Sequence, residues 1–187
     1  MLPTSRHRLL ATAASVTLML AACGDGGGDD SNTPCSSLDI MREAQSLTAD
    51  EASCILALHN AARASVTPAA DPPLEPLQWD GGLAGAASAY AQTCPTVPAT
   101  DGHGENLWKG TAGHFTIADA VNKWVSQKQW FTYGQPCAAP AGEYCGHYTQ
   151  IVWAPATKVG CGYAKCDGDI IVACNYDKIQ SGSDMPY

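Results

Sequence analysis

Three segments of the chain carry apolar residues at helical spacing, and each begins beside a residue that can cap a helix. These predicted helices span residues 48–64, 80–93 and 117–128. The first is the best defined, because Thr48 and Glu51 stand three residues apart and form a capping box. The sequence therefore predicts a helical first part for the folded domain.

The C-terminal part of the chain has a different pattern. Apolar and polar residues alternate over 147–153 and 159–165, which is typical of strands, and 169–176 is a more continuous apolar strand. Asp167-Gly168 between the last two segments predicts a tight turn. Helices followed by strands favour the α+β class, with the helices packed on an antiparallel sheet.

The residues before the first helix have the pattern of an export signal. An apolar run over 9–22 follows Arg6 and Arg8, and it is shorter than the roughly 20 residues that a membrane-spanning helix needs. The run ends in Leu-Ala-Ala-Cys at 20–23, which resembles the bacterial lipobox, where the cysteine carries a lipid. The alternative is an ordinary signal peptide with Cys23 beside its cleavage site.

The segment after this cysteine has no apolar side chain from Gly24 to Pro34, so we expect a flexible tether. The predicted organisation is a signal peptide over 1–22, a lipidated cysteine and linker over 23–34, and one folded domain over 35–187. We expect an extracytoplasmic protein, either anchored to a bacterial membrane or secreted.

Composition narrows the partners. The chain has 18 acidic and 10 basic residues and a net charge of −8, which argues against nucleic acid as a partner. Of the nine cysteines, Cys23 is assigned to the lipid, and the remaining eight predict four disulfides in an oxidising compartment. Spacing alone allows 105 pairings of eight cysteines. The absence of a Cys-x-x-Cys pair argues against a zinc finger.

Several ordered motifs then resemble one family, the CAP superfamily of cysteine-rich secretory proteins, antigen 5 and plant pathogenesis-related class 1 proteins. The motifs are HNAAR at 59–63, LQWDGGL at 77–83, GENLW at 104–108, CGHYTQIVW at 145–153, VGCG at 159–162 and VACNY at 172–176. The resemblance covers about residues 49–187. It implies a three-layer α-β-α sandwich with a central antiparallel sheet, stapled by disulfides.

The resemblance also implies a set of disulfide bridges. By position, the plant pattern gives Cys94–Cys166, Cys137–Cys145 and Cys161–Cys174. The two cysteines that remain, Cys35 and Cys54, would then pair.

Family members often carry two histidines and two glutamates in a cleft that sometimes holds zinc or another divalent cation. The resemblance places Glu105 and His147 at two of these positions. The other histidine position falls on Thr100, for which the nearby His103 is a candidate substitute, and the other glutamate position falls on Gln127. Two of the four positions therefore lack their usual ligand, and the alternative to a metal site is that Glu105 and His147 bond each other and join the helices to the sheet. We interpret His59 as structural and His114 as an exposed loop residue.

Sterol and lipid binding is a second theme of the family. Trp130, Phe131 and Tyr133 precede the loop that a Cys137–Cys145 bridge would close, and they are candidates for an apolar lid. The alternative is that these aromatic residues pack on the edge of the sheet.

Three functions follow. The leading one is a monomeric, non-enzymatic binder of small lipids such as sterols or fatty acids, which requires no cofactor. The second is a metal-dependent hydrolase that uses Glu105 and His147, with zinc or another divalent cation. The third is a protein-interaction module with a vestigial cleft.

Overall fold

The computed structural model describes residues 47–99, 101–181 and 184–187. The predicted signal peptide, Cys23, the linker, Cys35 and Thr100 lie outside these ranges. Along the described chain the elements are α1 (Ala49–Ala64), β1 (Gln78–Trp79), α2 (Gly81–Ala91), β2 (Gly104–Thr111), α3 (Ile117–Ser126), the 3-10 helix η2 (Gln127–Trp130), α4 (Gly146–Ile151), β3 (Lys158–Cys166) and β4 (Asp169–Tyr176). None of the helices in these ranges is long and apolar enough to cross a membrane.

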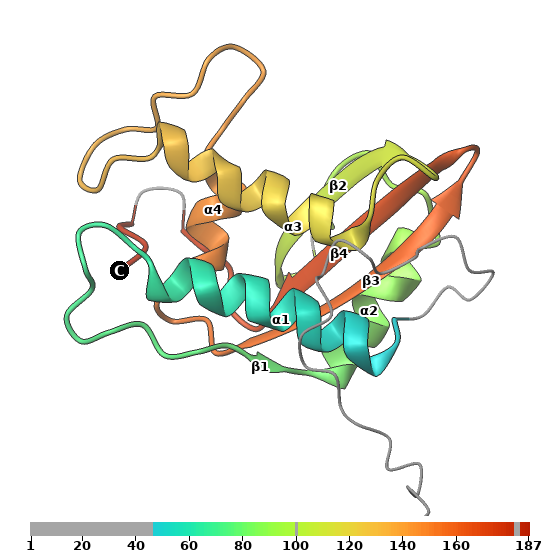
Figure 1. Cartoon of the computed structure of the whole chain (residues 1–187), viewed down its shortest axis with the longest axis horizontal. Coiled ribbons are helices and arrows are strands. Elements are labelled where there is room, and N and C mark those ends of the chain that lie inside the picture. Colours follow the sequence, from blue (N-terminus) through green and yellow to red (C-terminus); the bar gives the residue numbers. More distant parts are fainter. Residues whose placement is uncertain (1–46, 100, 182–183) are drawn as a thin grey trace, which may run out of the picture. The chain divides into compact units, whose positions relative to one another are not determined.

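The elements form three layers, which confirms the predicted α-β-α sandwich (Figure 1). Helices α1, α3 and α4 cover one face of the sheet, and α2 covers the other. The strand order is β1-β3-β4-β2. The three long strands pair antiparallel, as predicted, whereas the short β1 joins β3 in parallel. Strand β2, which the sequence pattern did not predict, occupies an edge of the sheet.

The two faces of the sheet differ in the size of their side chains. The face toward α1, α3 and α4 carries large buried residues, including Tyr163, Val172 and Tyr176. On the other face, a Cβ atom on Gly160 would lie 2.2 Å from the backbone nitrogen of Ala84 in α2. The absence of a side chain at Gly160 therefore allows the small-residue helix α2 to lie directly on the sheet.

Helix α1 is held in place by its HNAAR motif. The Asn60 amide accepts a hydrogen bond from the backbone N–H of Leu77 at 2.8 Å and donates one to the carbonyl of the same residue at 3.1 Å. Arg63 is only 1% exposed. Its guanidinium donates to the backbone carbonyls of Glu75, Ile151, Trp153 and Ala156. These residues of the motif therefore have a structural role.

The segment predicted as a strand over 147–153 is instead mostly helical, because α4 spans Gly146–Ile151. Its residues from Tyr148 to Ile151 are all buried, so no polar face reveals the helical period. The side chain of Gln127 accepts hydrogen bonds from two N–H groups of its first turn, which stabilises the helix start.

Three disulfides have both of their cysteines among the described residues, and they have the pairing that the resemblance implies. They are Cys94–Cys166, Cys137–Cys145 and Cys161–Cys174, with Cα–Cα distances of 5.8, 5.9 and 4.0 Å. Cys54 is also disulfide-bonded. Because Cys35 lies outside the described residues, the pairing Cys35–Cys54 stays a prediction.

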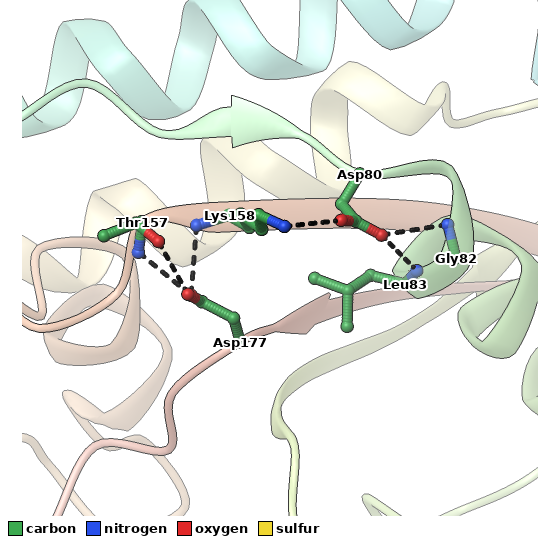
Figure 2. A network of polar contacts seen from close by, with 6 residues as sticks. All are labelled: Asp80, Gly82, Leu83, Thr157, Lys158 and Asp177. Carbon is green, nitrogen blue, oxygen red and sulfur yellow. Dashed lines mark hydrogen bonds and ion pairs between the residues drawn. The ribbon is translucent and has the colours of Figure 1, made fainter.

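A polar network joins the segments that meet beside the start of β3 (Figure 2). Just after β4, the Asp177 carboxylate accepts hydrogen bonds from the backbone N–H and hydroxyl of Thr157 and from the N–H of Lys158, at 2.7–3.0 Å. The Lys158 ammonium lies 3.2 Å from the carboxylate of Asp80. Asp80 in turn caps α2 through the N–H groups of Gly82 and Leu83.

Candidate functional site

His147 stands in the first turn of α4, beside the rings of Trp124 and Tyr144, with ring centroids 5.8 and 4.9 Å away. Its Nδ1 lies 2.9 Å from the side-chain nitrogen of Gln127. Burial lowers the pKa of His147 to about 4. The imidazole is therefore neutral at physiological pH.

Gln127 is 2% exposed and uses both ends of its amide. Its Oε1 accepts from the backbone N–H of His147 at 3.1 Å and from that of Tyr148 at 3.4 Å, while its Nε2 contacts the imidazole. The residue at the second glutamate position of the family pattern therefore binds both the ring and the backbone of His147.

These two residues line a hollow of about 270 Å³ between β2, α3 and the loop before α4. The other lining residues are Leu107, Trp108, Lys109, Lys123, Trp124, Gly142, Glu143 and Tyr144. Its two lysines are each paired with a carboxylate: Lys123 with Glu143 at 3.1 Å and Lys109 with Asp169 at 2.8 Å. The hollow therefore has no unpaired charge among its described lining residues.

Glu105 does not reach this hollow. Its neighbour Asn106 donates from its side chain to the carbonyl of His147, on the face covered by α3 and α4. Because successive side chains of a strand point to opposite faces, Glu105 points toward the α2 side of the sheet. There, its Oε1 accepts from the N–H of Ala99 at 3.0 Å, and burial raises the pKa of its carboxyl. The described residues contain no hydrogen bond between Glu105 and His147.

His103 also has a different neighbour. Its Nδ1 lies 3.2 Å from an Asp101 carboxylate oxygen, and both side chains are well exposed. Within the described ranges, no three residues among His, Cys, Asp and Glu are grouped so that they could hold a metal ion. The described residues at the family's metal position, which do not include Thr100, therefore do not fit a divalent cation.

A buried hydrogen-bonded chain links this region to α1. Asn106 donates to the hydroxyl oxygen of Tyr176 at 3.1 Å, and that hydroxyl contacts Nε2 of His59 at 2.8 Å. Nδ1 of His59 lies 2.7 Å from the carbonyl of Ile55, which can only accept, so Nδ1 carries the proton and Nε2 accepts from Tyr176. This arrangement agrees with a structural role for His59.

Two of the three candidate lid residues line a cleft of about 430 Å³. Phe131 and Tyr133 are among the residues that form it, together with Thr67, Pro68, Lys128, Thr132 and Tyr148. Trp130 is not among the residues that line this cleft. The ammonium of Lys123 lies 5.9 Å from the centroid of its ring. The ring of Phe131 packs against Tyr148 of α4, at 5.5 Å, rather than on the edge of the sheet.

Phe131 also borders a second cleft of about 540 Å³, which includes Tyr144, Met185 and Pro186. Tyr144 and Met185 are large apolar side chains that remain 54% and 44% exposed. The Phe131 ring is therefore a shared wall between two partly apolar hollows.

Tyr148 is a candidate site residue that the sequence pattern does not predict. Its hydroxyl is buried and has no hydrogen-bond partner among the described residues. Burial raises its pKa to about 12, so the hydroxyl keeps its proton and can donate. The only sequence signal was a tyrosine inside an otherwise buried segment, which does not distinguish a binding residue from a core residue.

Comparison with known proteins agrees with the fold and the motifs. The chain is 42% identical over 124 residues to pathogenesis-related protein 1B of Nicotiana tabacum, covering 64% of this chain and 70% of that protein. It is 41% identical over 130 residues to pathogenesis-related leaf protein 4 of Solanum lycopersicum, covering 66% and 75%. Among solved structures, venom allergen-like protein 4 of Schistosoma mansoni matches with a TM-score of 0.59 and 25% identity, over 72% of this chain and 92% of that one.

The model of the CAP, or cysteine-rich secretory protein, family matches residues 56–176. This range contains all six motifs and the three described disulfides. The chain therefore belongs to the cysteine-rich secretory protein family.

Proposed function

We propose that this protein binds a small lipid, such as a sterol or a fatty acid, in the clefts around Phe131, and that a lipid on Cys23 holds it at a membrane. The observation that carries the proposal is the Tyr148 hydroxyl, a buried donor that has no partner among the described residues and belongs to the wall of an apolar cleft. Buried polar groups are nearly always hydrogen-bonded, so an unpaired one in a cleft invites a ligand atom.

The chemistry of the cleft suits a molecule with one polar end. Phe131, Tyr133 and Pro68 offer apolar contact, whereas Tyr148 and Lys128 offer donors to a hydroxyl or carboxylate. Volumes of about 430 and 540 Å³ on the two sides of Phe131 lie in the range of small-molecule sites, roughly 300–1,000 Å³.

A groove between α1 and α2 is the competing location. It has about 540 Å³ and is lined by apolar residues that include Leu56, Trp79 and Cys161. None of its lining residues is among the described buried polar atoms that lack a partner. We therefore place the lipid at Phe131 and Tyr148.

The test is the variant Tyr148→Phe, which removes only the hydroxyl. The probes are cis-parinaric acid, a fluorescent fatty acid, and dehydroergosterol, a fluorescent sterol, each titrated separately into the purified protein. We expect saturable binding of at least one probe and about fivefold weaker binding in the variant, the effect of one lost hydrogen bond. The matched control is Tyr90→Phe, because the Tyr90 hydroxyl bonds the carbonyl of Val97 on the α2 side.

Stability separates this role from a packing role. Because the Tyr148 hydroxyl has no partner in the described part of the chain, Tyr148→Phe should leave the free energy of unfolding unchanged or raise it slightly. Failure of both probes to bind, or equal affinity in the variant and the wild type, would overturn the lipid proposal. The protein-interaction module would then become the leading function.

The anchor has its own test. The full chain should partition into the detergent phase of Triton X-114 when it is expressed in a bacterium with lipoprotein processing, and Cys23→Ser should move it to the aqueous phase. Detergent partitioning that persists in Cys23→Ser would contradict lipidation at this residue. The hydrolase alternative requires Glu105 and His147 to bind one metal ion. Glu105 points toward the α2 side of the sheet and His147 lies on the opposite side, so their arrangement gives this alternative no support.

A further inference from the structure

The orientation of the Gln127 amide is fixed by the backbone. Helix α4 has no capping side chain at its own N-cap residue, Cys145. Instead, Oε1 of Gln127 accepts from the N–H groups of His147 and Tyr148. Rotating the amide by 180° would place its NH₂ group against these two donors, so the observed orientation is the one that the hydrogen bonds allow.

The amide orientation decides where the proton of His147 lies. The NH₂ group of Gln127 is 2.9 Å from Nδ1 of His147, and an amide nitrogen can only donate. Nδ1 must therefore accept, and a neutral imidazole then carries its proton on Nε2. Among the described residues Nε2 has no hydrogen-bond partner, and it is not one of the fully buried unpaired atoms. Because His147 lines the 270 Å³ hollow and its Nδ1 is occupied by Gln127, the Nε2–H is the ring donor that remains for a ligand there.

This tautomer opposes metal binding. A histidine that binds a metal through Nε2 needs its proton on Nδ1, where a carboxylate or carbonyl normally accepts it. In this chain the group facing Nδ1 is a second donor. A glutamate at position 127 would accept from the imidazole and from the backbone at the same time, whereas glutamine cannot.

We propose that Gln127 is a positioning residue that fixes His147 as an Nε2–H donor, which closes the hollow to divalent cations and suits it to an uncharged oxygen acceptor of a ligand. The pairing of the Lys123 ammonium with the Glu143 carboxylate agrees with an uncharged ligand atom. The inference concerns a different hollow from the Tyr148 cleft and does not depend on lipid binding there.

The experiment compares Gln127→Glu with Gln129→Glu, an identical change two residues away at an exposed position. The side-chain nitrogens of ¹⁵N-labelled protein are recorded by long-range ¹H–¹⁵N NMR at pH 7, and His147→Gln assigns the His147 signals. Zinc chloride is then titrated into each protein.

The wild type and Gln129→Glu should show the Nε2–H pattern for His147 and no response of its signals to zinc. Gln127→Glu should shift His147 toward the Nδ1–H form and bind zinc at this residue at least tenfold more tightly. An Nδ1–H pattern in the wild type, or zinc binding at His147 as tight as in Gln127→Glu, would overturn the proposal. The wild-type spectrum decides the tautomer even if Gln127→Glu does not fold.

Discussion

Asn106, Tyr176 and His59 form a buried chain of hydrogen bonds in which each member has one fixed direction. His59 is fully buried, and burial lowers its pKa from 6.5 to about 4. Because Nε2 already accepts from the Tyr176 hydroxyl, protonating this nitrogen replaces an acceptor with a donor in the middle of the chain. Neutral His59 is therefore the form that the fold requires.

The stability of the protein should fall as the pH falls from about 6.5 to 4. The folded state keeps His59 neutral while the unfolded chain takes up a proton, so acid favours unfolding across this window. The difference between a pKa of 6.5 and one of about 4 corresponds to about 3 kcal/mol in the free energy of unfolding, and His147 acts in the same direction. Urea unfolding at pH 7, 5.5 and 4.5 measures this change.

Two variants test the origin of this pH dependence. His59→Gln should be less stable at pH 7 but should lose about 3 kcal/mol less than the wild type as the pH falls. His114→Gln, at an exposed position, should keep the wild-type slope. An unchanged slope in His59→Gln would show that other groups cause the acid sensitivity.

At the scale of elements, Asp177 joins β4 to the segment that leads into β3 (Figure 2). Its carboxylate accepts three hydrogen bonds from Thr157 and Lys158. We expect Asp177→Ala to lower the free energy of unfolding by about 1–2 kcal/mol, because two backbone N–H groups and a hydroxyl lose their acceptor at a partly exposed site. The control is Asp184→Ala, which removes the same charge from an exposed position, and equal losses in the two variants would contradict this role.

The sequence alone predicts some of these elements and not others. The capping box at Thr48 and Glu51 and the turn at Asp167-Gly168 predicted α1 and the β3–β4 hairpin, because both signals are local. Helix α4 was misread as a strand because its first turn is capped by Gln127, a residue about 20 positions earlier. Strand β2 was missed because it is an edge strand with polar residues such as Glu105 and Lys109.

The sequence likewise predicts only part of the candidate site. The family resemblance assigned His147 and Gln127 to one site, and their side chains contact each other. They could not reveal that alternation along β2 turns Glu105 away, since that depends on the register of β2 with β4. The unpaired hydroxyl of Tyr148 depends on every neighbour in three dimensions, so no linear pattern could predict it.

At the scale of the whole molecule, the disulfides close loops of very different length. Cys94 and Cys166 are 72 residues apart, whereas Cys137 and Cys145 are separated by only 8. A bridge restricts the unfolded chain more when its loop is longer, so their contributions to stability should differ. The long bridge connects the end of α2 to the end of β3, and the short one lies beside the Phe131 clefts.

Replacing both cysteines of a pair by alanine should reveal this difference. We expect the loss of Cys94–Cys166 to lower the free energy of unfolding by about 4 kcal/mol and the loss of Cys137–Cys145 by about 2–3 kcal/mol. The short bridge should matter more for binding, because Cys137 and Cys145 both line the larger Phe131 cleft. Urea unfolding and probe titration of the two double variants measure both effects. A larger stability loss from the short bridge would mean that native contacts, rather than the restriction of the unfolded chain, dominate its contribution.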